Sequence, residues 1–259
     1  MIIKKSLDEI EIMARAGALV AKAHEEVGAA LKPGMTTLDI DRIAERVITG
    51  AGAVPSFKGY RGFPATLCTS VNHEIVHGIP SERVVLQEGD VLSIDCGAIV
   101  DGFHGDSAMT RVVGGIDTVD DETRDLIETT REAMWAGLRA ADVGNRLGDI
   151  GAAVQAHGDE KGYGIVRQYV GHGIGRALHE DPSVPNFGRA GKGFKLSAGL
   201  VIAIEPMFNL GTAETRELQD GWTVVTADGK PSAHWEHTVA ITPEGPWILT
   251  ARSDEPSRL

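Results

Sequence analysis

The sequence predicts an α+β fold made of two related halves, each combining helices with antiparallel strands, with a site between them. Two observations favour this fold. A pattern of leucine, glycine, apolar residues and a terminal acid over residues 86–95 recurs over residues 196–205, which is 110 residues further along. No Pro/Ser-rich segment or block of charge divides the chain, so composition marks no linker. We therefore expect residues 1–259 to form a single domain with pseudo-symmetric halves, roughly 1–115 and 116–259.

The same offset extends beyond this pattern. It carries Gly34 onto Gly144 and Asp39 onto Asp149. Matches of a few apolar residues arise by chance, but a shared offset over two separated segments is harder to explain in that way. Both copies of the main pattern also end their strand on an acid. We expect the two copies to be related by a pseudo-two-fold axis.

The first half contains two predicted helices and a predicted hairpin. Residues 7–31 place apolar side chains near a 3.6-residue period, and the Lys-Pro-Gly at 32–34 ends that helix. A second helix begins near Thr36 and runs to about residue 48. Residues 84–113 predict a β-hairpin, with its turn at Asp101-Gly102.

The second half repeats this order. The apolar patterns predict helices over residues 121–141 and 148–161. Three later segments read as strands, at residues 200–205, 222–226 and 234–241.

Composition and charge exclude several classes of protein. The net charge of −12 supplies no basic stripe, so we find no direct nucleic-acid-binding signature and no affinity for anionic membranes. Cys68 and Cys96 form no Cys-x-x-Cys motif, which favours a reducing compartment. No apolar run has the length of a signal peptide or approaches the ~20 residues of a membrane span. We expect a soluble, cytoplasmic protein.

Two acids lie on facing arms of the predicted hairpin. The midpoint of Asp95 and Asp106 falls within about a residue of the turn. Allowing for a bulge near Gly102 or Gly105, we expect the two carboxylates to face each other, with Cβ atoms ~4.5–5.5 Å apart. A buried pair of acids must protonate or hold cations. The alternative is a solvated acidic hairpin tip, which the apolar run before Asp95 disfavours.

Three further residues complete a candidate metal set: His172, Glu205 and Glu236. Glu205 ends an almost wholly apolar strand, where an unpaired carboxylate is costly. Glu236 shares its strand face with His234 and Thr238. Four carboxylates and one imidazole suit hard divalent ions such as Mn²⁺, Fe²⁺ or Co²⁺. Four acids are too many for one ion but fit a pair ~3.5–4 Å apart.

Other motifs receive no role. The glycines at 171, 173 and 175 lack the Gly-x-Gly-x-x-Gly spacing, and the Gly-Lys-Gly at 191–193 lacks the remaining parts of a phosphate loop. Cys96 alternates away from Asp95 on the strand, so we interpret it as a core residue.

Five segments of the chain together resemble the methionine aminopeptidases. They are residues 70–80, 94–106, 171–182, 204–207 and 220–238. The resemblance spans nearly the whole chain and matches all five metal-ligand positions in order. It implies the pita-bread fold, in which two halves surround a central dinuclear metal site.

The resemblance also implies roles for single residues. Asp106 and Glu236 would bridge two divalent ions (Co, Mn, Fe or Zn). Asp95 would complete one metal site, and His172 with Glu205 the other. Glu205 would also move the proton of the nucleophilic water. The catalytic histidines matching the family, which flank the substrate and stabilise the tetrahedral intermediate, would be His77 and His179.

The family's methionine pocket can be carried over in part. Residues matching its tight apolar slot are Tyr60, Phe63, Cys68 and Trp222. Phe57 stands in this slot in place of a small residue, and Leu178 stands where an aromatic is common. Both keep the pocket apolar but alter its outline.

The implied function is removal of the initiator methionine from nascent proteins by two-metal-assisted hydrolysis of the first peptide bond, with a preference for a small second residue. The partners implied are nascent polypeptide N-termini and a transient contact with the ribosome, and family habit favours a monomer. The lack of an insertion of ~60 residues before Glu205 and of an amino-terminal zinc module favours the short bacterial type I form.

Two alternatives stay open. Proline-specific aminopeptidases and prolidases use the same ligand types, but resemble a chain with a substantial extra domain ahead of the catalytic one. A non-enzymatic relative that binds proteins or RNA is expected to lose metal ligands and gain basic tails. This chain retains all five ligand positions and is acidic.

Overall fold

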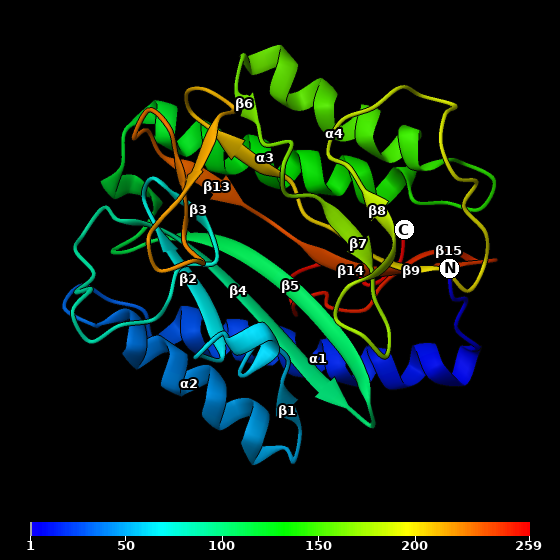
Figure 1. The fold of residues 1–259 in the computed structure, drawn as a ribbon, viewed down its shortest axis with the longest axis horizontal. Coiled ribbons are helices and arrows are strands. Elements are labelled where there is room, and N and C mark those ends of the chain that lie inside the picture. Colours follow the sequence, from blue (N-terminus) through cyan, green and yellow to red (C-terminus); the bar gives the residue numbers. More distant parts are fainter. Residues whose placement is uncertain (1) are drawn as a thin grey trace.

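Four helices enclose a group of antiparallel sheets in the computed structural model, which describes residues 2–259 (Figure 1). The helices are α1 (Leu7–Ala30), α2 (Thr37–Gly50), α3 (Asp121–Ala140) and α4 (Leu147–Lys161), with short 3₁₀ turns η1 (Tyr60–Gly62) and η2 (Ile116–Thr118). In Figure 1, α1 and α2 lie on one side of the strands, and α3 and α4 on the other. The predictions of four helices and of an α+β fold are confirmed.

The strands form four sheets. Strands of the first half are β1 (Val54–Pro55), β2 (Leu67–Val71), β3 (Glu74–Val76), β4 (Val91–Val100) and β5 (Phe103–Val112). Strands of the second half are β6 (Gly164–Ile165), β7 (Gly171–Gly173), β8 (Glu180–Val184), β9 (Val201–Ile204), β10 (Met207–Asn209), β11 (Thr215–Glu217), β12 (Val224–Thr226), β13 (Ser232–His234), β14 (His237–Thr242) and β15 (Gly245–Ile248). The main sheets are β1-β4-β2, with β5 beside β4, and β15-β14-β9-β7-β8.

Local sequence explains where the helices begin. Ser6 caps α1 by accepting the Glu9 amide, and the Glu9 carboxylate accepts the Ser6 amide in return. Thr36 and Asp39 make the same reciprocal pair at α2. The apolar face of α1 is buried against β4 and β5. No helix among residues 2–259 is long and apolar enough to cross a membrane.

The 110-residue offset has a structural counterpart. The Gly34 amide donates to the Leu86 carbonyl over 2.8 Å, and the Gly144 amide donates to the Leu196 carbonyl over 3.2 Å. Both glycines adopt positive φ, 88° and 94°, which a residue with a Cβ rarely does. Isolated β-bridges join residues 36 and 85 in one half and residues 146 and 195 in the other. The repeated residues therefore tie the starts of α2 and α4 to the segments that lead into β4 and β9.

The predicted facing of Asp95 and Asp106 is wrong in register. The turn holds two residues, Asp101 and Gly102, at φ 48° and 79°, and no bulge interrupts the ladder beyond it. Asp95 therefore pairs with Ala108, and Asp106 pairs with Gly97. The two carboxylates share one face of the hairpin but are diagonal neighbours, because a two-residue turn fixes the pairing of every residue after it.

The predicted strand over residues 234–241 is interrupted. β13 ends at His234 and β14 begins at His237, which leaves Trp235 and Glu236 outside the strands. Glu236 instead exchanges backbone hydrogen bonds of 3.0 and 3.3 Å with Ala108 of β5. The interruption therefore joins a segment of the second half to the first half at the level of the predicted metal ligands.

Substitution of Gly17 tests the close packing of α1. An added Cβ would lie 2.1 Å from the Leu249 carbonyl oxygen, so Gly17→Ala must shift backbone and should destabilise the protein by about 1–3 kcal/mol or more. Gly28→Ala on the same helix is the matched control, because its Cβ would meet nothing nearer than Met109 Cε at 3.8 Å. Helix propensity then predicts a gain of roughly 0.5–1 kcal/mol. Urea unfolding measures both, and equal effects would contradict the packing.

Candidate metal centre

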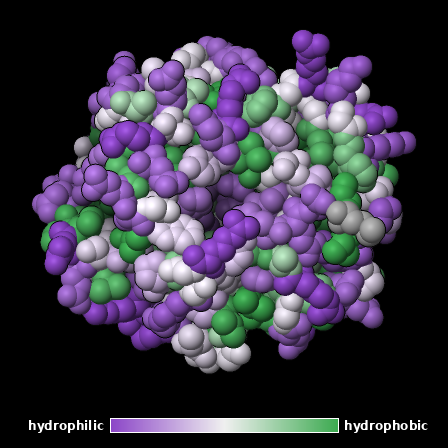
Figure 2. Space-filling view, viewed as in Figure 1, coloured by the Kyte–Doolittle hydropathy of each residue, from purple (hydrophilic) through white to green (hydrophobic). Residues whose placement is uncertain are grey.

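One cavity contains every residue that the sequence predicts for the site. Its lining residues are Phe57, Tyr60, Arg61, Phe63, Cys68, His77, Asp95, Asp106, His172, Leu178, His179, Glu205, Trp222 and Glu236. Figure 2 shows a hollow near the centre of the face seen in Figure 1, surrounded mainly by hydrophilic side chains. The cavity has an acidic end and an apolar end, and both halves of the chain contribute to it.

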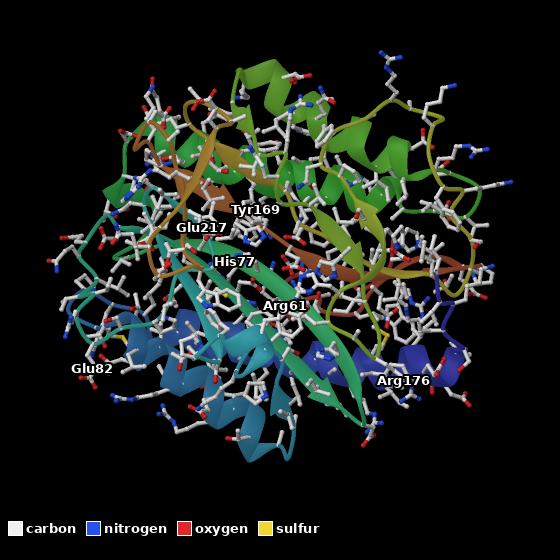
Figure 3. The ribbon with its side chains drawn as sticks, in the orientation of Figure 1. Arg61, His77, Glu82, Tyr169, Arg176 and Glu217 are labelled. Atoms are coloured by element: carbon white, nitrogen blue, oxygen red, sulfur yellow. The ribbon has the colours of Figure 1, made fainter. Side chains whose placement is uncertain are left out.

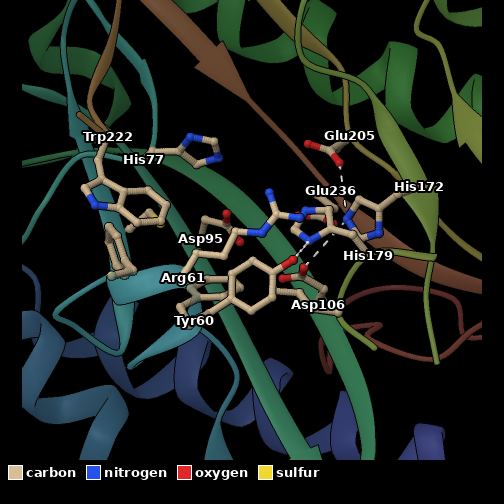
Figure 4. A pocket seen from close by; sticks show the side chains of 14 residues that line it. Tyr60, Arg61, His77, Asp95, Asp106, His172, His179, Glu205, Trp222 and Glu236 are labelled. Carbon is tan, nitrogen blue, oxygen red and sulfur yellow. Dashed lines mark hydrogen bonds and ion pairs between the residues drawn. The ribbon is translucent and has the colours of Figure 1, made fainter. Parts of the chain in front are cut away.

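The acidic end is built where strands are paired or interrupted. Asp95 projects from β4 and Asp106 from β5, while His172 lies in β7. Glu205 follows the last residue of β9, and Glu236 lies in the gap between β13 and β14. Ligand atoms of Asp106, His172 and Glu236 all lie within 4.8 Å of one another (Figure 4).

The backbone of Asp106 is held by a hydroxyl. Thr238 Oγ1 accepts the Asp106 amide over 3.1 Å and donates to the Asp106 carbonyl over 2.8 Å. Thr238 lies two residues after Glu236, on the face of the chain that the sequence assigned to both. One short segment of the second half thus carries an acid into the site and fixes the position of another.

The carboxylates of the acidic end lack protein partners that would neutralise them, so they are suited to bind a cation. Oδ1 of Asp95, Oδ1 of Asp106 and Oε1 of Glu236 are buried without a hydrogen-bond partner. Among the described residues 2–259, histidines are the basic side chains that contact the four acids, and no lysine or arginine pairs with them. Unpaired buried acceptors are costly, and hard oxygen ligands suit divalent cations.

Electrostatics in the acidic end favour bound positive charge. Burial raises the pKa of Asp95 to about 7. Burial, with the neighbouring carboxylates, also raises the pKa values of Asp106, Glu205 and Glu236 well above their usual range. A bound cation would offset both the cost of burial and the repulsion between the carboxylates, because it stabilises their ionised forms.

His172 is prepared as a neutral ligand. Burial lowers its pKa to about 3, so the imidazole is uncharged at neutral pH. Its Nδ1 lies 2.9 Å from the Gly173 carbonyl oxygen, which can only accept, so Nδ1 carries the proton. The lone pair of Nε2 then faces the acids, at 3.5 Å from Glu205 Oε1 and 4.0 Å from Asp106 Oδ2. A backbone carbonyl orients metal-binding histidines in this way.

The apolar end contains the predicted slot. Phe63 and Trp222 meet edge to face, with ring centroids 5.1 Å apart. Cys68 and Phe57 are buried beside them, and burial raises the pKa of the Cys68 thiol, which therefore stays protonated. Leu178 is buried in the same cluster. The slot is therefore lined by aromatic, aliphatic and thiol side chains.

Two histidines lie between the acidic end and the slot. Tyr60 Oη lies 3.0 Å from His179 Nδ1, and the His179 ring lies 4.2 Å from that of His172. His77 adopts the left-handed region, with φ 62°, and its ring meets Tyr169 edge-on at 5.6 Å (Figure 3). Burial lowers the pKa of His77 to about 4 and also lowers that of His179. Both imidazoles are therefore neutral.

The sequence did not single out two residues of the site. Arg61, on a left-handed turn residue with φ 49°, extends into the cavity in Figure 4, and an exposed arginine in a turn carries no sequence signal for this. His234 is buried with its Nε2 3.7 Å from Glu205 Oε2. The alternation of side chains along the predicted strand placed His234 on the same face as Glu236. This was the one sequence signal that His234 lies near the site.

Comparison with known proteins gives consistent similarities. Residues 11–243 match metallopeptidase family M24. Methionine aminopeptidase of Clostridium acetobutylicum is 52% identical over 96% of this chain and 99% of that protein. Methionine aminopeptidase 1 of Bacillus subtilis is 51% identical over 96% of this chain and 99% of that protein.

Solved structures agree with the sequences. The crystal structure of methionine aminopeptidase from Thermotoga maritima is 42% identical, has a TM-score of 0.94, and covers 97% of this chain and 100% of that one. A prolidase from Pyrococcus horikoshii is 24% identical with a TM-score of 0.78, and covers 98% of this chain and 65% of the prolidase. The second likeness shows a shared fold alone.

The raised pKa of Asp95 predicts how the chelator-treated protein responds to pH. Its value rises from 3.8 to about 7 on folding, so its stabilising contribution is complete below pH 4 and is lost as the pH rises through 7. Asp95→Asn should therefore reduce the loss of stability between pH 5 and pH 8 by roughly 2–4 kcal/mol. Urea unfolding in chelator at several pH values measures this.

The same titration contains its own control. Asp101→Asn, which replaces an exposed acid at the hairpin turn outside the cavity, is the matched control. Parallel stability curves for the wild type and Asp95→Asn would show that Asp95 does not ionise within this range.

Proposed function

We propose, since this chain belongs to metallopeptidase family M24 and to its methionine aminopeptidases, that it releases the initiator methionine from new polypeptides. It is a metal-dependent aminopeptidase with the pita-bread fold. The observation that carries the function is one cavity in which an acidic end with unpaired carboxylate oxygens adjoins an apolar slot. Such a cavity holds one apolar side chain beside the bond to be cut.

The acidic end would hold two divalent ions. We assign Asp106 and Glu236 to both ions, Asp95 to one of them, and His172 with Glu205 to the other. Support comes from the surplus of acids over the need of one ion and from their unpaired buried oxygens. The donor set admits Co, Mn, Fe or Zn. When bound, the ions would supply Lewis acidity toward water and the scissile carbonyl.

The side chains around the ions would handle protons and developing charge. Glu205 lies at the acidic end of the cavity, beside His172, where it would take a proton from the attacking water and deliver it to the leaving amine. If Tyr60 donates to His179 Nδ1, the proton of that ring lies on Nε2 and can be donated to the developing oxyanion. His77, neutral and held between Tyr169 and Trp222, would serve as the second donor.

The slot would select the first residue of the substrate. Phe57, Tyr60, Phe63, Cys68 and Trp222 offer aromatic and sulfur surface to an unbranched thioether. The free amino terminus would approach the carboxylates, and the second residue would pass between His77 and His179. We expect a small second residue to be preferred there.

Further properties follow as proposals. Residues 1–259 would act as a single catalytic domain, because both halves supply ligands to one site. A nascent N-terminus as substrate would require the enzyme to act in the cytoplasm, in transient contact with ribosomes. The buried free thiols of Cys68 and Cys96 suit a reducing compartment. We propose that the active form is the monomer, because one chain supplies the complete set of site residues.

A peptide panel tests the named function. Met-Ala-Ser should be cut and Ala-Pro-Ser should not, and norleucine at the first position should be accepted because a closed apolar pocket discriminates by only ~1–3 kcal/mol. Lysine at the first position should be rejected, because the slot offers its charge no partner. Acetylated methionyl peptides and Met-Arg-Ser should resist cleavage. Amino-acid analysis of the released residues measures each rate.

The panel also separates the alternatives. Cleavage of Ala-Pro-Ser alone would assign the chain to the proline-directed enzymes that share its fold. Equal cleavage of lysyl or acetylated peptides would contradict the assignment of the slot and with it the function.

Replacement of Asp106 tests the shared ligand. Asp106→Ala should abolish methionine release and weaken the binding of both ions, whereas Asp95→Ala should weaken one more than the other. Metal analysis after dialysis against a defined free-cation concentration measures both variants. Two tightly held ions in Asp106→Ala would show that this carboxylate is not shared.

A further inference from the structure

The carboxylate of Glu205 lies between two imidazoles. Its Oε1 is 3.5 Å from His172 Nε2, and its Oε2 is 3.7 Å from His234 Nε2. Figure 4 shows the first of these contacts, with Glu205 above His172. The side of Glu205 away from the proposed metal ligand therefore faces a second histidine, to which neither the resemblance nor the proposed mechanism gives a part.

His234 is buried and its Nε2 is unpaired. The residue is 2% exposed, and Nε2 has no hydrogen-bond partner. Leaving such a group unsatisfied costs roughly 1–3 kcal/mol, so a buried imidazole nitrogen aimed at a carboxylate needs an explanation. The separation of 3.7 Å is about 0.5 Å longer than the upper limit of ~3.2 Å for an N–H···O hydrogen bond, and active-site contacts commonly shorten when the site is loaded.

The backbone fixes where this imidazole can be. Thr110 Oγ1 accepts the His234 amide over 2.9 Å and donates to the His234 carbonyl over 2.8 Å. His234 also pairs with Met207, the first residue of β10, two residues after Glu205. Strand pairing therefore holds the two side chains next to each other, and the interruption of the chain after His234 turns Glu236 toward β5.

We infer that His234 is a positioning residue for Glu205. Nε2–H donates to Oε2 and keeps the carboxylate from rotating, so that Oε1 stays directed at His172 and the acidic end. This inference rests on the proposed function, in which Glu205 both contacts an ion and carries a proton. His234 is not among the residues that line the cavity, so its loss should impair the chemical step rather than substrate binding.

Two substitutions distinguish a hydrogen-bond donor at position 234 from a side chain that only fills space. His234→Leu keeps an apolar side chain but removes the donor, and His234→Gln returns an N–H donor of similar reach. With metal-loaded protein and Met-Ala-Ser, His234→Leu should lower kcat ~10–100-fold and leave KM nearly unchanged. His234→Gln should recover most of kcat. His157→Gln, on the outer helix α4, is the control and should match the wild type.

Two measurements do not depend on activity. Isothermal titration of Mn²⁺ into the chelator-treated protein should show affinity weakened ~10-fold in His234→Leu and restored in His234→Gln. In ¹⁵N NMR spectra of labelled protein, Nε2 of His234 should be the protonated nitrogen, and its resonance should move in Glu205→Gln. The NMR comparison holds even if His234→Leu folds poorly.

Each result bears on the inference. Wild-type kcat in His234→Leu, a His234→Gln variant no better than His234→Leu, or a proton on Nδ1 would overturn it. An additive loss when His234→Leu is combined with Glu205→Gln would do the same, because the donor acts only through that carboxylate. If the wild type releases no methionine, the proposed function fails, while the titration and NMR results still decide the contact.

Discussion

Four carboxylates share one buried space, and most features of the molecule follow from the need to keep them there. Asp95, Asp106, Glu205 and Glu236 repel one another and have lost the water that would screen them, which explains their raised pKa values. Lysine or arginine partners would neutralise the cluster permanently and block cation binding. The structure instead surrounds it with neutral histidines, which can contact acids without supplying a competing charge. The instability of the site without cations is thus the source of its affinity for them.

The fold meets this need in two ways: three of the proposed ligands lie within paired strands, and Glu205 and Glu236 lie where strands end or are interrupted. Asp95 and Asp106 lie within the unbroken β4–β5 ladder and reach the site because side chains alternate between the two faces of a strand. The gaps at residues 205–206 and 235–236 release Glu205 and Glu236 from their own sheets. The second gap also lets Glu236 pair with Ala108 of β5, so the backbone contact between the halves lies beside the site. The two copies of the 110-residue repeat end on Asp95 and Glu205, which places one acid from each half there.

Much of this could be predicted from the sequence, because the decisive signals are local. Helix starts follow from caps such as Ser6 and Thr36, and the ligand types follow from acids that end apolar runs. The prediction that Asp95 and Asp106 lie directly opposite each other failed because the register depends on the number of residues in the turn. The prediction assumed a bulge, and the hairpin has none. The contact of His234 with Glu205 depends on the pairing of β13 with β10, which no local pattern specifies. Arg61 was missed because its approach to the cavity depends on a left-handed turn conformation that non-glycine residues seldom adopt.

Neutral histidines also explain how one site can bind cations and move protons. An imidazolium beside the acids would satisfy them and compete with metal, but burial lowers the pKa values of His172 and His77 to about 3 and about 4. Each neutral ring then has one nitrogen that donates and one that accepts a hydrogen bond. The hydrogen-bond partner of the ring determines which nitrogen carries the proton. The Gly173 carbonyl makes His172 an acceptor toward the cavity, whereas a donated Tyr60 hydroxyl makes His179 a donor. The same residue type therefore serves as ligand and as oxyanion donor, and the difference lies in the partner behind each ring.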